Sequence, residues 1–321
     1  LILVSFVASV VLTALKFYAY YLTSSNAILS DALESIINVI ASGFAFYSIY
    51  LSSLPKDRNH PYGHGKIEFF SAGFEGALIV IASIFIFIEG AKRLLEPAPI
   101  ENLEQGALFI LVTIFVNFII GVRLVKLGRE TNSLALTADG KHLLSDSVSS
   151  LILIASVILI LLTDFLWIDS VASMFFGLFL AYSGFKLVRK SVEGLMDATD
   201  EDLVKKVVDQ LNANKKTEWI DVHNLRVQQY GSDLHVDCHL TLPYYWDLLK
   251  VHDEVHQFEE ILKSVHCGET EIFVHTDPCI PECCKFCSVL ECPVRQEPFH
   301  EDLPWTVLNL VKNQKLYLQM E

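Results

Sequence analysis

Long apolar stretches fill the first 190 residues of this chain, and they constrain its fold more than any other feature. A helix needs about 20 mostly apolar residues to cross a lipid bilayer. Stretches of that length lie at about 1–22, 27–54, 69–95, 104–125, 143–163 and 166–188. The chain is 52% hydrophobic and only 19% charged, which is too apolar for an ordinary soluble domain. The sequence therefore predicts an integral membrane protein with a bundle of six transmembrane helices.

The charge balance changes sharply after the last of these stretches. Residues 1–190 carry 13 Lys and Arg against 14 Asp and Glu, whereas residues 191–321 carry 11 against 24. We therefore expect a six-helix transmembrane domain over 1–190, a soluble domain over 191–278 and a Cys-rich extension over 279–321. The acidic balance argues against nucleic acid as a partner, because phosphate backbones attract basic surfaces.

Basic residues predict the orientation of the helices in the lipid bilayer. Ten of those between the apolar stretches fall on one side of the membrane, and Lys92 and Arg93 fall on the other. The side rich in Lys and Arg is cytoplasmic by the positive-inside rule, so the acidic part should face the cytoplasm. We expect a bacterial-type inner membrane or plasma membrane. The chain opens inside an apolar stretch without Met, so its natural N-terminus should lie upstream.

The soluble domain shows an alternation of short elements. Its pattern predicts a helix at about 200–213, strands at 217–230 and 233–242, a helix at 247–264 and a strand at 269–276. This α-β-β-α-β order is typical of a small α+β fold with helices on one face of a three-stranded sheet. A last amphipathic stretch runs from about 303 to 318.

Two of the apolar stretches carry matching polar stripes. The second holds Asp31, Glu34 and Asn38, and the fifth begins with Asp139, His142 and Asp146, with the same spacing of three and then four residues. These positions share one face of a helix. Ionisable groups at membrane depth are costly unless they face an ion, a cavity or a partner, so we expect Glu34, Asn38, His142 and Asp146 to bind a metal ion.

The alternative is that the stripes only join helices by hydrogen bonds, and Asp31 and Asp139 are expected to have such a structural role. Glu75, Glu89 and Asn117 also lie inside apolar stretches, and lone polar groups of this kind more often pack helices together.

The loop after the second stretch is a second candidate metal site. It carries Asp57, His60 and His64 within eight residues, close to Pro and Gly. Imidazole and carboxylate are common zinc ligands. A polar loop ordered by its own hydrogen bonds is the alternative.

Histidines are concentrated in the soluble domain, where eight of the 11 follow residue 220. His223 opens one expected strand, His239 lies on the next, and His275 and Asp277 alternate at the end of the third. Residues two apart point to the same face of a strand, so these side chains could gather around an ion such as Zn²⁺. Histidines buried in an interface and held by hydrogen bonds are the alternative.

A run of cysteines begins directly after His275 and Asp277 in the sequence. Five thiols within 14 residues form a plausible Zn²⁺ or Cu(I) site, because soft thiolates favour these ions. In a cytosolic setting the alternative is a set of reduced, unliganded thiols. The five residues are Cys279, Cys283, Cys284, Cys287 and Cys292.

Together these features resemble the cation diffusion facilitator family over roughly residues 1–278. The resemblance rests on the two polar stripes, on the segment from Tyr62 to Lys66 with His60 before it, and on the His-rich α+β domain. It implies a homodimeric exporter that exchanges a divalent metal, commonly zinc, for protons. It also implies a metallochaperone-like cytosolic domain that binds metal at the dimer interface.

The resemblance assigns roles to residues at matching positions. It also implies an interlock between Lys66 at the start of the third helix and Asp197 just after the sixth. The transport site is Glu34, Asn38, His142 and Asp146, the loop site is Asp57, His60 and His64, and the cytosolic sites use His223, His239, His252, His275 and Asp277.

One departure bears on metal identity. Zinc-transporting members usually carry His or Asp where this chain has Glu34, and Asp where it has Asn38. An oxygen-rich site with one imidazole suits Zn²⁺, Fe²⁺ or Mn²⁺. We favour zinc as the substrate, with iron or manganese as the alternatives.

Other classes of protein fit the sequence less well. A passive divalent-cation channel and a membrane-anchored metal sensor are the rival interpretations. An enzyme is not expected, because no His-Glu-x-x-His motif or activated nucleophile accompanies the intramembrane groups.

Overall fold

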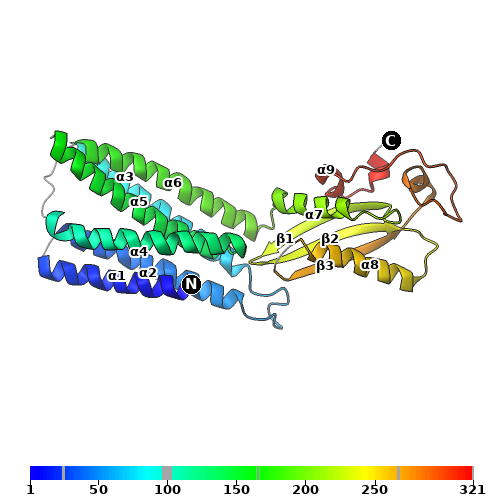
Figure 1. The fold of residues 1–321 in the computed structure, drawn as a ribbon, viewed down its shortest axis with the longest axis horizontal. Coiled ribbons are helices and arrows are strands. Elements are labelled where there is room, and N and C mark those ends of the chain that lie inside the picture. Colours follow the sequence, from blue (N-terminus) through cyan, green and yellow to red (C-terminus); the bar gives the residue numbers. More distant parts are fainter. Residues whose placement is uncertain (24–25, 96–102, 164, 166, 266–267, 320–321) are drawn as a thin grey trace. The chain divides into compact units, whose positions relative to one another are not determined.

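The structure is a computed structural model that describes residues 1–23, 26–95, 103–163, 165, 167–265 and 268–319 (Figure 1). The chain divides into two compact units, Leu1–Met196 and Asp197–Glu321. Each unit has hydrophobic clusters of its own.

The first unit consists of long helices, one at each predicted apolar stretch. Helix α3 packs along α6, α4 along α5 and α1 along α2, so the unit is a bundle (Figure 1). The helices are α1 (Ile2–Thr23), α2 (Asn26–Ser52), α3 (Ile67–Leu95), α4 (Leu103–Glu130), α5 (Leu134–Thr163) and α6 (Trp167–Leu195). Within the described residues, three stretches are long and apolar enough to cross a membrane, namely Ile67–Lys92, Leu111–Glu130 and Ser170–Leu195.

The connection between α4 and α5 is shorter than the sequence predicts. We expected a polar break from about Arg129 to Lys141, but only residues 131–133 separate the helices, and Asn132 has a positive φ of 53°. The length of an apolar stretch indicates only the part of a helix that suits a lipid environment. A helix can continue through polar residues, because its backbone hydrogen bonds do not depend on apolar side chains. His142 therefore lies two turns inside α5 rather than at its start.

Glycines let α5 approach α4 closely beside the polar stripe. A Cβ atom on Gly121 of α4 would lie 2.9 Å from the carbonyl oxygen of Gly140 on α5, and a Cβ on Gly140 would lie 2.7 Å from the backbone nitrogen of Val125. Neither position has room for a side chain. This contact fixes the position of α5 along α4, and its rotation about its own axis, next to His142.

We expect Gly140→Val to force the two helices apart. Overpacking of a close contact typically costs about 1–3 kcal/mol, so the purified protein should unfold at a lower temperature. Thermal unfolding in detergent measures this effect. The matched change Ala155→Val, at an exposed position of the same helix, should leave the unfolding temperature unchanged. Equal stability of the two variants would contradict this account of the contact.

The second unit is a small α+β fold, as the order of elements predicts (Figure 1). The sheet has the strand order β1-β2-β3, with β2 antiparallel to β1 and parallel to β3. A parallel neighbour requires a crossover connection, and α8 provides it. The elements are α7 (Glu201–Ala213), β1 (Asp221–Tyr230), β2 (Asp233–Leu242), α8 (Leu248–Lys263) and β3 (Thr270–Pro278).

The segment after β3 is part of this fold. It contains the short helices η1 (Pro281–Phe286), α9 (Val307–Leu310) and η2 (Leu316–Gln319). The side chains of Leu303, Trp305, Leu310 and Leu316 are at most 4% exposed and share one hydrophobic cluster with α7, α8 and the sheet. The amphipathic stretch at 303–318 therefore helps to close the core of the second unit.

Candidate metal sites

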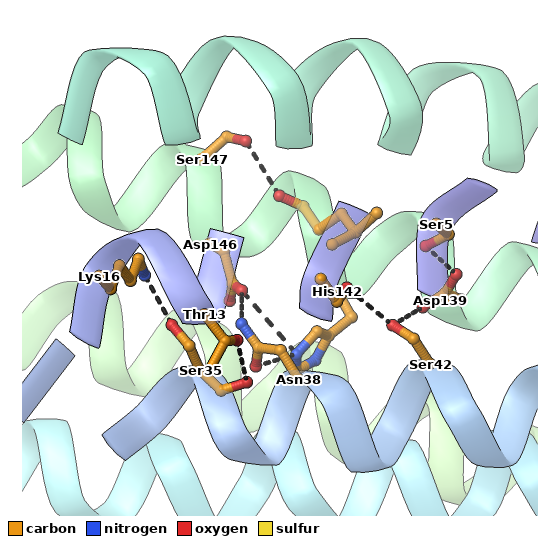
Figure 2. A network of polar contacts seen from close by, with 12 residues as sticks. Ser5, Thr13, Lys16, Ser35, Asn38, Ser42, Asp139, His142, Asp146 and Ser147 are labelled. Carbon is orange, nitrogen blue, oxygen red and sulfur yellow. Dashed lines mark hydrogen bonds and ion pairs between the residues drawn. The ribbon is translucent and has the colours of Figure 1, made fainter. Parts of the chain in front are cut away.

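Three of the four predicted transport-site side chains meet inside the helical unit. The Asn38 amide of α2 lies between His142 and Asp146 of α5 (Figure 2). Its Nδ2 donates a hydrogen bond to Asp146, and its Oδ1 lies 2.8 Å from His142 Nε2. His142 Nε2 and the Asp146 carboxylate are 3.9 Å apart. The fourth residue, Glu34, belongs to α2, but its side chain lies outside those that the structure describes.

Helix α1 adds a cation beside this group. Lys16 Nζ donates a hydrogen bond of 2.7 Å to the Ser35 hydroxyl, directly next to Glu34 in the sequence (Figure 2). Sequence reasoning missed this contact, because no spacing rule relates α1 to α2.

Asp139 has the contacts of a structural residue. Its carboxylate is fully buried and accepts hydrogen bonds from the hydroxyls of Ser5 at 2.7 Å and Ser42 at 3.0 Å (Figure 2). It joins α1, α2 and α5 one turn from His142. The Asp31 side chain lies outside the described ones.

Glu75 of α3 differs from the packing role expected for it. Its side chain is 1% exposed, and neither carboxylate oxygen has a hydrogen-bond partner among the described residues. The carboxyl group lies within electrostatic reach of Asp139 and Asp146. It is an additional acidic group near the polar stripe of α5, and no spacing in the sequence indicates this proximity.

The loop between α2 and α3 gathers its three predicted ligands. The candidate ligand atoms of Asp57, His60 and His64 all lie within 4.8 Å of one another. Asp57 Oδ2 is 3.4 Å from His64 Nε2, and its Oδ1 is 3.2 Å from His60 Nδ1. Gly63 turns the chain between the histidines at a φ of +89°, which a residue with a side chain rarely adopts.

Backbone hydrogen bonds hold the Asp57 carboxylate in its ionised form. The N–H groups of His60 and Asn59 donate to Oδ1 at 2.7 and 2.8 Å, and the pKa of Asp57 is therefore lowered, chiefly by the bond from His60. A lowered pKa stabilises the folded loop above the ordinary Asp pKa of about 4, and this stability is lost as pH falls through the lowered value.

We therefore expect the turn at Asp57 to persist at pH 4 and to open only at more acidic pH. Amide hydrogen exchange of residues 59 and 60 measures it. The matched change Asp57→Asn keeps a short acceptor but removes the charge, so the protection of these amides relative to their intrinsic exchange rates should no longer depend on acidification. An Asp57 carboxyl group that titrates at or above the ordinary value would contradict the expected lowering.

The sheet of the second unit brings a third group together. His223, His239 and Asp277 come from three adjacent strands, and their candidate ligand atoms all lie within 4.8 Å of one another. The Asp277 carboxylate is 3.4 Å from His223 Nε2 and 3.3 Å from His239 Nδ1. His275 lies beside the group, with its ring centroid 4.6 Å from that of His239. The strand register explains this, because His239 pairs with both His223 and His275.

Two further contacts surround the sheet group. His223 Nδ1 lies 3.1 Å from the fully buried Asp221 carboxylate, an arrangement that leaves Nε2 facing Asp277. Lys315 Nζ lies 3.8 Å from Asp277. Sequence reasoning missed Lys315, because the segment that carries it folds back from far along the chain. The fifth predicted residue, His252, is exposed on α8 and does not belong to this group.

The five predicted thiols line one pocket at the end of β3. They are more loosely spaced than the other groups, since no three of their sulfur atoms lie within 4.8 Å of one another. Burial raises the pKa of both Cys279 and Cys287. None of the cysteines in the described part of the chain forms a disulfide bond.

The predicted interlock joins residues of different units. Lys66 lies just before α3 in the first unit, and Asp197 is the first residue of the second. Their pairing stays a prediction.

Comparisons with known proteins agree with this architecture. Residues 2–196 match the cation efflux transmembrane domain, and residues 199–279 match the cytoplasmic domain of cation efflux proteins. An uncharacterized transporter of Synechocystis sp. is 30% identical over 271 residues, which cover 84% of this chain and 87% of that protein. The cation-efflux pump FieF of Shewanella oneidensis is 27% identical over 278 residues, covering 85% and 92%. FieF of Yersinia pestis is 27% identical over 277 residues, covering 84% and 89%.

The two domains define an integral membrane transporter with a cytoplasmic C-terminal domain. The chain belongs to the cation efflux family, also called the cation diffusion facilitator family, whose members transport divalent metal cations. The family resemblance in the sequence is thereby confirmed.

Proposed function

We propose that this protein exports a divalent transition-metal cation in exchange for protons, with Glu34, Asn38, His142 and Asp146 as the transport site. Zinc is the favoured substrate, and iron or manganese are the alternatives. In this proposal six helices cross a bacterial inner or plasma membrane, and the protein acts as a homodimer. The observation that carries it is the contact of Asn38 with both His142 and Asp146 across α2 and α5.

The orientation of the Asn38 amide supports the exchange of protons. An ionised Asp146 offers only acceptors, so it takes the Nδ2–H donor of the amide and leaves Oδ1 facing His142. Because Oδ1 is also an acceptor, the 2.8 Å contact with the amide in this orientation is a hydrogen bond when His142 carries its hydrogen on Nε2. A metal ion needs the lone pair of the same nitrogen. A proton and a metal ion therefore exclude each other at this atom.

The ligand types support a first-row divalent cation. Asn38 supplies a neutral amide oxygen, Glu34 and Asp146 supply carboxylates, and His142 supplies one imidazole. Such an oxygen-rich set does not by itself select one of Zn²⁺, Fe²⁺ and Mn²⁺. The loop group and the sheet group would bind the same cation on the cytoplasmic side, and metal at the sheet group would bias the dimer towards transport through a difference in affinity between states.

The test is metal uptake into proteoliposomes that contain the purified full chain, with an imposed proton gradient. Zn²⁺, Fe²⁺, Mn²⁺, Co²⁺ and Cd²⁺ are offered separately. We expect uptake of at least one ion to accelerate with the gradient and to slow when a protonophore collapses it.

Each other outcome contradicts a defined part of the proposal. Uptake at the same rate with and without the gradient indicates a passive channel and removes the exchange of protons. Absence of uptake for every ion removes transport and favours a membrane-anchored metal sensor. A preference for Fe²⁺ or Mn²⁺ removes zinc as the substrate.

A further inference from the structure

The Cys-rich loop lies outside the proposed transport site and the two His and Asp groups, and all of it after Cys279 lies beyond the residues that match the family domains. It follows β3 and runs from Cys279 past Cys292, and the matched cytoplasmic domain ends at residue 279. We propose that Cys279, Cys284, Cys287 and Cys292 bind one Zn²⁺ ion as a tetrathiolate site. This assignment is independent of the transported metal.

The first argument is that the four thiols surround one pocket. Cys279 interacts electrostatically with Cys284, Cys287 and Cys292, and Cys287 does so with Cys292, although no three of the sulfur atoms lie within 4.8 Å of one another. All four line the same pocket. The spacing of Cys284 and Cys287 is the Cys-x-x-Cys pattern common in structural zinc sites.

The fifth thiol has a different environment. Cys283 is 1% exposed and packs against Ile220 and Cys287 in a small hydrophobic cluster. Its sulfur accepts a hydrogen bond of 3.5 Å from the backbone N–H of Ile280 within the same turn. We therefore assign Cys283 to the packing of the loop and the other four to the ion.

Donors and positive charge are aimed at the proposed ligands, as expected around metal-bound thiolates. The backbone N–H of Tyr244 donates to Cys279 Sγ at 3.5 Å, and that of Val289 donates to Cys287. The Tyr245 hydroxyl group forms a hydrogen bond with Cys292. Arg295 lies within electrostatic reach of Cys287.

Arg295 also holds the loop in its curved shape. Its guanidinium group donates to the carbonyl oxygens of Cys284 at 3.0 Å, Cys287 at 2.9 Å and Val289 at 2.6 Å. One side chain therefore fixes the backbone on both sides of the Cys-x-x-Cys pair. Arg295 is a positioning residue of the site.

Binding requires the thiols to draw closer together. Zinc–sulfur distances are about 2.3 Å, so the sulfur atoms must approach more closely than they do here. Cys279, Cys284 and Cys292 are only half-buried, so rotation of their side chains can bring this about without moving the core.

The test is a Co²⁺ titration of the reduced full chain in detergent after treatment with a chelator. Thiolate ligands give Co²⁺ an intense near-ultraviolet charge-transfer band, which His and Asp ligands do not give. We expect this band to saturate at about one Co²⁺ per chain and to vanish when Zn²⁺ is added, since Zn²⁺ favours tetrathiolate sites.

Two variants locate the site. Cys284→Ser combined with Cys292→Ser should abolish the band, because both residues are half-buried and their loss leaves the core intact. Cys238→Ala is the matched control, since that thiol is 2% exposed in the core of the sheet and its pKa is raised to about 12 by burial. The control should keep the band.

Several results would overturn the assignment. Wild-type protein without the band has no tetrathiolate site, whatever the variants do. A band that survives the double substitution excludes Cys284 and Cys292 as ligands. Binding of Cu(I) by a chain that gives no Co²⁺ band removes zinc in favour of copper. None of these readouts depends on transport, so the outcome is separate from that of the proposed exchange.

Discussion

Replacing Asp146 with alanine should abolish metal transport. The carboxylate contacts Asn38 directly and lies 3.9 Å from His142 Nε2, so it completes the described group inside the helical unit. Removal of even an outer-shell partner of a metal costs about 10–100-fold in affinity or activity. Loss of Asp146, which we propose as a direct ligand, should cost at least as much, and uptake into proteoliposomes under a proton gradient measures it.

A control substitution of a carboxylate outside this group distinguishes loss of the site from a general loss of stability. Glu130 lies at the exposed end of α4 and pairs with Lys126 at 3.9 Å. Glu130→Ala should transport at the wild-type rate, because an exposed ion pair contributes only about 0–1 kcal/mol. If Asp146→Ala folds and still transports normally, the polar stripes of α2 and α5 serve only to hold the helices together.

Replacing Asp277 with asparagine should remove metal from the sheet group. Asp277 is the shared contact of His223, His239 and Lys315, so its charge is central to the group. We expect metal affinity there to fall by at least about 10–100-fold. The number of Zn²⁺ ions bound per chain should fall by one when this change is made in an Asp146→Ala background, which removes a ligand of the proposed transport site.

The control for this change lies on the neighbouring strand. Asp237 is two residues before His239 and so points to the same face of β2, but it does not belong to the group. Asp237→Asn should leave the number of bound ions unchanged. An equal loss in both variants would mean that the acidic surface, and not the gathered ligands, attracts the metal.

The sequence predicts those contacts that depend on local spacing. Asp57, His60 and His64 lie within one short loop, and His142 and Asp146 are one helical turn apart, so chain geometry alone brings them together. The sheet group could also be predicted from the sequence. His275 and Asp277 alternate on one strand, His239 lies on another, and the order of the strands is simple. The helices of the first unit could be predicted from the length of the apolar stretches. The helices and strands of the second unit could be predicted from the alternation of short sequence patterns.

Contacts between distant segments could not be predicted in this way. Lys16 meets Ser35, and Lys315 meets Asp277, because of how whole elements pack, and neither pair has a spacing signal. The start of α5 was placed too late because polar residues near a helix end resemble a loop. The stretch at 303–318 has an amphipathic pattern but forms only short helices, so its partner in the core could not be identified from the pattern.

The buried side chains of Leu303, Trp305, Leu310 and Leu316 also set an order of events during synthesis. These residues emerge from the ribosome after every helix and strand they pack against. Domains generally fold as units while the chain is being made, but here the cytoplasmic core stays open until its last segment arrives. A nascent chain that still lacks this segment therefore exposes apolar surface of the sheet, α7 and α8, and chaperones have access to that surface during this period.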